Sequence, residues 1–393
     1  MKDETDEPAE KSPLAHRTSL PEDAKSGASR DSCRHTGQTL SAAMIGKLQA
    51  VKEQQKYKRK TANRQQKNRQ RRGRTMAFQN VTLVGGGVLG AQIAFQSAFK
   101  GFHVTIWLRS EGSIGRTQPK IDLIRQSYLK ELAGLRANLG NPSYNYPRGI
   151  VDSMEGLDAA KIDALEKQVE EAYHSLKITL DLAEAVKDAD LVIEAMAENL
   201  EQKRDIFQKM APLLPEKTVL VTNSSTLLPS AMADATGRPE KFLALHFANE
   251  IWRFNTAEVM GQPKTDPKYY GQVVEFAKQI SMIPLCLKKE QPGYILNSML
   301  VPFLFSAESL AANDVADPET IDQTWRLATG APSGPFRILD VVGLTTAYNI
   351  ALMTPGADNP DSNAGKILAF LKKYIDAGKT GMAAGEGFYK YKK

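Results

Sequence analysis

The stretch Val81-Thr82-Leu83-Val84-Gly85-Gly86-Gly87-Val88-Leu89-Gly90 decides the fold of this chain. Val81–Val84 is a short apolar run typical of a buried strand in a parallel sheet, and the pattern from Val88 to Lys100 predicts a helix. Between them the glycines follow the spacing G-x-G-x-x-G. A strand, a glycine turn and a helix in this order open an α/β domain.

The glycine turn also predicts a ligand. Gly85 permits a tight turn, Gly87 lets the backbone approach a pyrophosphate, and Gly90 lets the helix pack on the strand. The N-terminus of the helix offers free N–H groups to phosphates. We therefore expect a dinucleotide to be bound by Gly85, Gly87, Val88, Leu89 and Gly90.

Toward the C-terminus, apolar runs alternate with helical patterns, which is typical of a Rossmann-type parallel sheet. Helices are predicted at Lys120–Ala137 and Leu157–His174. Further strands are predicted at Val104–Leu108, Leu191–Glu194, Val219–Val221, Phe242–His246, Glu258–Met260 and Ile283–Leu287.

Gln291-Pro292-Gly293 ends this pattern, and only helical patterns follow. These helices are expected at Tyr294–Ala312, Pro318–Ala328, Ile338–Met353 and Asn363–Ala377. We therefore predict an α/β domain over residues 76–290 and a smaller all-α domain over residues 291–393.

Residues 1–75 differ in charge from the rest. They hold 18 basic and 9 acidic side chains, whereas the remainder holds 33 and 36. We expect a disordered basic tail or an upstream extension before Met76. The arginine- and lysine-rich stretch 47–74 leaves RNA binding open as a function of the tail alone.

Composition excludes several other classes of protein. No apolar run is long enough to cross a membrane, and no secretory signal precedes the first strand. Cys33 and Cys286 are too few for a disulfide framework or a zinc site. Cys286 lies in an apolar run, so we expect it to be buried. A cytoplasmic protein without a metal is expected.

The end of the second predicted strand bears on the choice of dinucleotide. NAD-binding versions of this fold place an acidic residue there, which binds the ribose 2′-hydroxyl. Here Leu108 occupies that place and is followed by Arg109 and Ser110, which suit a 2′-phosphate. Glu111 could substitute if the turn is longer. The sequence leaves NAD(H) and NADP(H) both open.

His246 and Glu258 predict a proton acceptor. Moving a hydride from a secondary alcohol requires its hydroxyl proton to leave, and a neutral imidazole accepts protons near pH 7. His246 ends a predicted strand, where α/β sheets place their ligands. Glu258, on the next strand, could bond the other imidazole nitrogen. A structural histidine is the alternative.

Ser225 and Asn297 are two further candidates. Ser225 follows the predicted strand Val219–Val221 and could donate to a substrate oxygen, although a helix cap or turn residue is the alternative. Asn297 lies in an apolar helical pattern, where a polar amide is costly unless it is bonded. It could face a cleft between the domains or form an interhelical hydrogen bond.

From Met76 to Lys393 the chain resembles the 3-hydroxyacyl-CoA dehydrogenase family. The matching pieces, in the family's order, are Leu83–Gly90, Ile193–Leu200, Thr222–Ser225, His246–Asn249 with Glu258, Pro292–Asn297, Gly334–Phe336 with Asp340, and Gly385–Lys390. The resemblance implies an NAD-dependent oxidoreductase of fatty-acid metabolism, as in β-oxidation, that acts on a short-chain (S)-3-hydroxyacyl-CoA as a homodimer.

The resemblance also implies roles for individual residues. His246 would be the catalytic base and Glu258 its orienting partner, while Ser225 and Asn297 would bind the substrate. Contacts with the cofactor are implied for Glu198, Lys203, Ser225 and Asn249. From the residues alone, the alternative for Glu198 and Lys203 is a pair of exposed charges on a helix.

Two segments depart from the family's pattern. After Asn249 the family has an apolar, proline-rich stretch, where this chain has Glu250-Ile251-Trp252-Arg253-Phe254-Asn255-Thr256. Ala383-Ala384 replaces a Lys-Thr pair before Gly385-Glu386-Gly387, and Lys379 is the nearest substitute for the lysine. These changes leave open a related dehydrogenase of a free hydroxy acid or sugar acid, and a cofactor-binding protein with a structural or regulatory role.

Overall fold

The computed structural model describes residues 78–391, which lie within the compact unit Met76–Lys393. Their first part forms one eight-stranded sheet in the order β3-β2-β1-β4-β5-β6-β7-β8. The strands are β1 Asn80–Val84, β2 His103–Trp107, β3 Lys177–Thr179, β4 Leu191–Glu194, β5 Val219–Thr222, β6 Phe242–Phe247, β7 Thr256–Met260 and β8 Ile283–Cys286.

The first six strands pair in parallel, whereas β7 runs antiparallel to β6 and β8 pairs parallel to β7. After β1 the chain adds β2 and β3 on one side of this strand, and then crosses over to add β4 on its other side. This reversal opens a crevice at the carboxyl ends of β1 and β4, where such sheets bind ligands.

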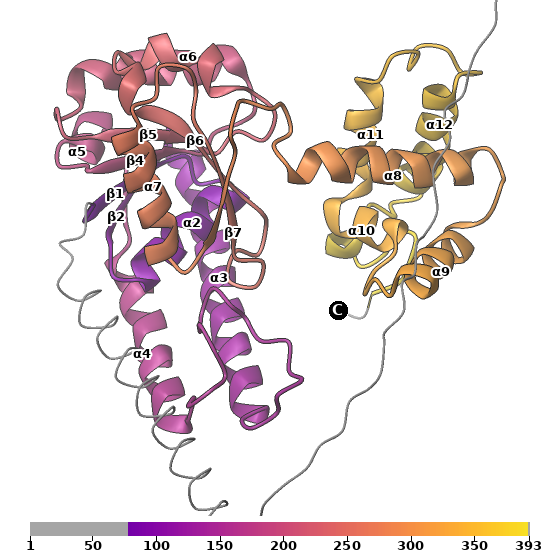
Figure 1. Ribbon diagram of the computed structural model, residues 1–393, viewed down its shortest axis with the longest axis horizontal. Helices are drawn as coiled ribbons and strands as arrows, with labels where there is room; N and C mark the ends of the chain where they lie inside the picture. Colours follow the sequence, from indigo (N-terminus) through magenta and orange to yellow (C-terminus); the bar gives the residue numbers. More distant parts are fainter. Residues whose placement is uncertain (1–77, 392–393) are drawn as a thin grey trace, which may run out of the picture. The chain divides into compact units, whose positions relative to one another are not determined.

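Helices cover both faces of the sheet (Figure 1). Alternate strand residues point to opposite faces, so Leu83 packs into one apolar cluster and Val84 into the other. The first face is covered by α2 Val88–Phe99, α3 Glu111–Ala137, α4 Ala159–Ser175 and α7 Pro267–Gln279, and the second by α5 Leu182–Val186 and α6 Leu200–Met210.

The last part of the described chain is helical and has its own core, drawn in orange to yellow in Figure 1. Its centre is Leu304, Phe336, Leu339, Ile367 and Leu371. Its helices are α8 Leu296–Ala312, α9 Pro318–Thr329, α10 Pro335–Val342, α11 Leu344–Leu352 and α12 Asn363–Asp376. The predicted fold class, a Rossmann-type sheet followed by a smaller all-α part, is confirmed.

Several details differ from the sequence predictions. The helix expected from Lys120 starts at Glu111, and the helix expected over Ile338–Met353 is two helices, because Gly343 adopts φ 92° between them. Cys286 is exposed rather than buried, because β8 is the edge strand of the sheet.

Within residues 78–391 no helix is long and apolar enough to cross a membrane. The tail, residues 1–75, and its basic stretch 47–74, for which the sequence leaves RNA binding open, lie outside the described residues. The cytoplasmic location stays a prediction from the sequence.

Candidate active site

At the glycine turn after β1, packing of the protein itself requires glycine at Gly85 and Gly90 but not at Gly87. Gly85 adopts φ 115°, and a Cβ there would lie 2.7 Å from the carbonyl oxygen of Ala195. A Cβ on Gly90 would overlap the carbonyl of Gly85. At Gly87, by contrast, the nearest protein atom is 4.0 Å away. The protein alone does not require glycine there, whereas a ligand resting against the backbone would.

A cavity of about 560 Å³ opens over this turn. It joins the carboxyl ends of several strands, and its size suits part of a dinucleotide. Of the residues predicted to bind cofactor, it is lined by Gly85, Gly87, Val88, Leu89, Gly90, Arg109, Glu198, Ser225 and Asn249. Lys203 is not among the lining residues. A larger cavity, of about 890 Å³, lies at the amino ends of β1, β2 and β3, away from the glycine turn.

His246 and Glu258 face each other across β6 and β7. The antiparallel register pairs the two residues directly, which places both side chains on the same face of the sheet. His246 Nδ1 lies 3.0 Å from Glu258 Oε2, and both side chains are buried. With Nδ1 engaged by a carboxylate, Nε2 remains the nitrogen able to exchange a proton with a ligand.

Glu258 has a second set of partners at the start of the helical part. Its Oε1 accepts hydrogen bonds from the backbone N–H groups of Ile295 at 2.8 Å and Leu296 at 3.0 Å. Burial would raise the pKa of Glu258, but the hydrogen bonds from His246, Leu296 and Ile295 outweigh it and lower that pKa below its ordinary value. The side chain is therefore an anion beside the imidazole.

Tyr294 forms one wall of the histidine site. Its ring stacks on the imidazole of His246 with centroids 4.6 Å apart and planes 22° from parallel. Tyr294 is a non-glycine residue at φ 55°, and its buried hydroxyl has no hydrogen-bond partner among the described residues. This conformation immediately precedes the N–H groups that reach Glu258, so it belongs to the same turn.

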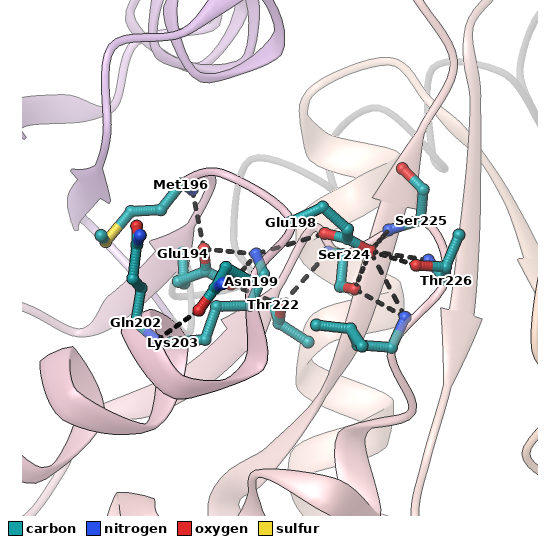
Figure 2. A network of polar contacts seen from close by, with 11 residues as sticks. Glu194, Met196, Glu198, Asn199, Gln202, Lys203, Thr222, Ser224, Ser225 and Thr226 are labelled. Carbon is teal, nitrogen blue, oxygen red and sulfur yellow. Dashed lines mark hydrogen bonds and ion pairs between the residues drawn. The ribbon is translucent and has the colours of Figure 1, made fainter. Parts of the chain in front are cut away.

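Next to the cofactor cavity lies a buried ion pair (Figure 2). Lys203 Nζ contacts both oxygens of Glu194 at 2.7 and 2.9 Å, and both side chains are essentially unexposed. Thr222 Oγ1 and the N–H of Met196 also donate to Glu194. Removing one partner of such a pair leaves an uncompensated charge, at a cost of about 3–5 kcal/mol. The pair therefore holds the ends of β4, β5 and α6 together.

Glu198 extends this network to the turn that carries Ser225. Its Oε1 accepts hydrogen bonds from the backbone N–H groups of Ser225 at 2.9 Å and Thr226 at 2.8 Å, and from the hydroxyls of Ser224 and Thr226. Lys203 Nζ lies 3.5 Å from Glu198 Oε2. Burial would raise the pKa of Glu198, but the Ser224 and Thr226 bonds and the charge of Lys203 lower it overall.

The structure brings only some of the predicted residues together. His246 and Glu258 are bonded directly, whereas Ser225 lies in the cofactor cavity and its backbone is held by Glu198. Asn297 is the second residue of α8, and its side chain is half-buried. Within residues 78–391 no hydrogen bond joins the side chain of Ser225 or Asn297 to His246. Their roles stay predictions, as do those of Glu198 and Lys203 toward the cofactor.

Sequence reasoning missed how firmly the segment between β6 and β7 is fixed. Arg253 makes a two-point ion pair with Glu131 of α3, through Nε at 2.9 Å and Nη2 at 2.7 Å. Glu250 adopts φ 55°, and its backbone N–H donates a hydrogen bond to Oε1 of Gln92 of α2 at 2.9 Å. The carbonyl of Trp252 accepts from Gly149. This segment, residues 250–255, is called the β6–β7 loop below.

Comparison with known proteins agrees with the geometry. Residues 147–291 match the family model for the 3-hydroxyacyl-CoA dehydrogenase NAD binding domain, and residues 293–391 match that for its C-terminal domain. The glycine turn lies ahead of the first match. The mitochondrial hydroxyacyl-coenzyme A dehydrogenase of Rattus norvegicus is 32% identical over 80% of this chain and 92% of its own.

Two further relatives frame the substrate question. The 3-hydroxybutyryl-CoA dehydrogenase of Clostridioides difficile is 29% identical over 80% of this chain and 99% of its own. The solved structure of a diketoreductase, described as acting on dicarbonyl compounds, is 48% identical over 80% of this chain and 99% of its own, with a TM-score of 0.68. The chain belongs to the 3-hydroxyacyl-CoA dehydrogenase family, whose members are nicotinamide-dependent oxidoreductases acting on a CH–OH group.

Proposed function

We propose that the chain interconverts a short-chain (S)-3-hydroxyacyl-CoA and the corresponding 3-oxoacyl-CoA, as in fatty-acid β-oxidation. The observation that carries this proposal is the hydrogen bond between His246 Nδ1 and Glu258 Oε2. It leaves one imidazole nitrogen for a hydroxyl proton and provides an anion to stabilise the imidazolium that forms.

In the proposed reaction, Nε2 of His246 accepts the proton of the 3-hydroxyl group as the C3–H bond breaks. Glu258 fixes the imidazole tautomer and offsets the positive charge. Ser225 and Asn297 donate hydrogen bonds to the substrate oxygens. The bound dinucleotide supplies the acceptor for the hydride in this direction and its source in reverse.

For the cofactor we favour NADP(H) over NAD(H). The residue directly after β2 is the buried Leu108, whose side chain cannot accept a hydrogen bond from a ribose 2′-hydroxyl. Arg109 follows it and lines the cofactor cavity.

A second candidate substrate is a dicarbonyl compound that is not carried on coenzyme A. The 48% identity to a diketoreductase favours it.

A parallel assay separates the two substrates. Acetoacetyl-CoA and 2,4-pentanedione are each offered with NADPH and with NADH, and nucleotide oxidation is followed by absorbance. Faster turnover of acetoacetyl-CoA is the expected result. Turnover of 2,4-pentanedione alone would replace the thioester by a free dicarbonyl, and turnover of neither would overturn the proposal.

We also propose that the protein forms a homodimer through its helical part. Large apolar side chains are exposed there at 62–78% of their area, namely Met299, Val315, Leu327, Val341 and Met353. Large exposed apolar side chains are a feature of surfaces through which subunits associate. Light scattering after size-exclusion chromatography tests this, since a monomer at micromolar concentration would contradict it.

A further inference from the structure

One end of the cofactor cavity is basic. It is formed by the carboxyl end of β2 and the first three turns of α3. Its lining residues are Trp107, Leu108, Arg109, Ser113, Arg116, Thr117 and Lys120, together with the glycine turn. In Rossmann-type folds the adenosine ribose binds at this end of the cavity, because this end lies next to the second strand.

No carboxylate lines this end of the cavity. Leu108 is 3% exposed, and its Cδ2 atom would lie 2.8 Å from a Cβ on Gly86, so its side chain packs under the glycine turn. Glu111, the alternative acceptor suggested by the sequence, is the exposed first residue of α3 and does not line the cavity. A ribose 2′-hydroxyl therefore has no acidic partner here.

Donors take the place of the missing acid. Arg116 Nη2 donates to Ser113 Oγ at 3.0 Å, and Ser113 Oγ lies 3.0 Å from Ser110 Oγ. Arg109, the residue directly after Leu108, lines the same end of the cavity. Within residues 78–391 neither Arg109 nor Arg116 is paired with a carboxylate, so both guanidinium groups are available to an anion.

We propose that Arg109, Ser113 and Arg116 form a subsite for the 2′-phosphate of the adenosine ribose, which makes the protein select NADP(H) over NAD(H). This inference rests on the proposed function only for the presence of a dinucleotide in the cavity. Guanidinium groups bind phosphate through two parallel hydrogen bonds, and each charge-assisted bond contributes about ten- to a hundredfold in affinity. NAD lacks the group that these residues would hold.

Binding is measured on the full chain without substrate, so the result does not depend on the acyl group. Isothermal titration calorimetry compares NADP⁺ with NAD⁺, and 2′,5′-ADP with 5′-ADP. Trp107 lines the cavity and provides a fluorescence signal for the same titrations. We expect NADP⁺ and 2′,5′-ADP to bind at least ~10-fold more tightly than their partners.

The variants Arg109→Ala and Arg116→Ala should each weaken the binding of NADP⁺ and of 2′,5′-ADP by ~10-fold or more. The affinity for NAD⁺ should change by less than about threefold. Arg148→Ala is the control. Arg148 is exposed and does not line the cavity, so its loss changes the net charge equally but should leave the preference unaltered. Leu108→Asp should shift the preference toward NAD⁺.

The outcomes separate this inference from the proposed function. Equal or tighter binding of NAD⁺, or equal losses for both dinucleotides in the arginine variants, would overturn the phosphate subsite and leave the dehydrogenase intact. Binding of neither dinucleotide would overturn the proposed function itself. Thermal unfolding of each variant without ligand shows whether a loss of affinity reflects a loss of fold.

Discussion

His246 on β6 and Glu258 on β7 are paired residue to residue across two antiparallel strands, and Nδ1 of the first lies 3.0 Å from Oε2 of the second. Neighbouring strands are among the most rigid elements of a domain, so the geometry of this pair depends little on loops. The sheet itself thus positions the proposed base and its partner.

Replacing His246 by Gln should remove the proposed base and keep a polar side chain of similar size. We expect kcat to fall by about 10²- to 10⁴-fold, because that is the usual contribution of general base catalysis. The dissociation constant for the dinucleotide should stay within about threefold, since the glycine turn is untouched. Near-native turnover would remove His246 from the mechanism.

Glu258→Gln should keep the shape of the site but remove its anion. The imidazolium formed on proton transfer then lacks its counter-charge, and we expect kcat to fall by about 10- to 10³-fold. Stopped-flow measurement of the hydride step gives the rate directly. Glu250→Gln is the control, because Glu250 is exposed and uses its backbone N–H for its bond to Gln92. Equal effects of the two variants would contradict the assignment.

Glu198→Gln tests whether this carboxylate positions Ser225. We expect kcat/KM for the acyl substrate to fall by up to ~100-fold, because a small displacement of a binding group has effects of that size. Glu201→Gln, one turn away with an 86% exposed side chain, is the control.

The same variant has a pH signature in stability. The pKa of Glu198 is lower in the folded protein than in the unfolded chain, so the unfolded chain binds more protons. The contribution of the Glu198 carboxylate to the free energy of unfolding is therefore complete above about pH 4.5. It is lost as the pH falls through the lower pKa of the folded state. The melting temperature of Glu198→Gln should therefore lie below that of the wild type at pH 7, with the gap narrowing below pH 4. A constant gap would contradict this.

Arg253→Met should loosen the β6–β7 loop. We expect KM for the acyl substrate to rise by about 3- to 30-fold with the cofactor affinity unchanged, since a partly exposed pair of this kind contributes roughly 1–2 kcal/mol. Adding Glu131→Gln should cause little further loss, because the two residues share one interaction. Arg125→Met breaks a similar pair between α3 and α4 and is the control. An equal rise in KM there would refute a specific role for the loop.

Glu308→Gln should stabilise the helical part at neutral pH. Glu308 on α8 is 4% exposed, and its Oε1 has no partner among the described residues. Burial raises its pKa to about 8. As the pH rises, the Glu308 carboxyl therefore loses its proton at a lower pH in the unfolded chain than in the folded protein. The free energy of unfolding falls as the pH rises from about 4.5 to 8.

The gain from Glu308→Gln should be small at pH 5 and reach roughly 3 kcal/mol at most by pH 7. Guanidinium unfolding at the two pH values measures it. Glu171→Gln on the exposed face of α4 should show no such dependence. A variant less stable than the wild type at pH 8 would show that the Glu308 carboxylate has a partner in solution.

Much of the fold follows from local pattern. The strand Val81–Val84 and the helix after it have strong periodicity, and their limits differ from the structure by one residue at most. The first turns of α3 were missed because Gly112, Gly115 and Pro119 are poor helix formers, and packing of Thr117 on Gly86 overrides that preference. Strand β3 is too short to carry a pattern.

Part of the candidate site could also be predicted from local sequence pattern. His246 ends one predicted strand and Glu258 begins the next, so their proximity depends on the antiparallel direction of β7. Periodicity does not predict that direction, and the pairing of the two residues was expected from the family resemblance. The contacts of Glu198 with the turn after Ser224 and of Arg253 with Glu131 join residues 26 or more positions apart. Sequence periodicity carries no information about such contacts, which depend on the packing of whole elements.

Glu258 uses one oxygen for the imidazole and the other for the first N–H groups at α8. A displacement of α8 is therefore transmitted to the proposed base through this carboxylate, with no other side chain between the two. A ligand that shifts the start of this helix would alter proton transfer as well as its own binding. Affinity and turnover would then vary together among substrates of different length.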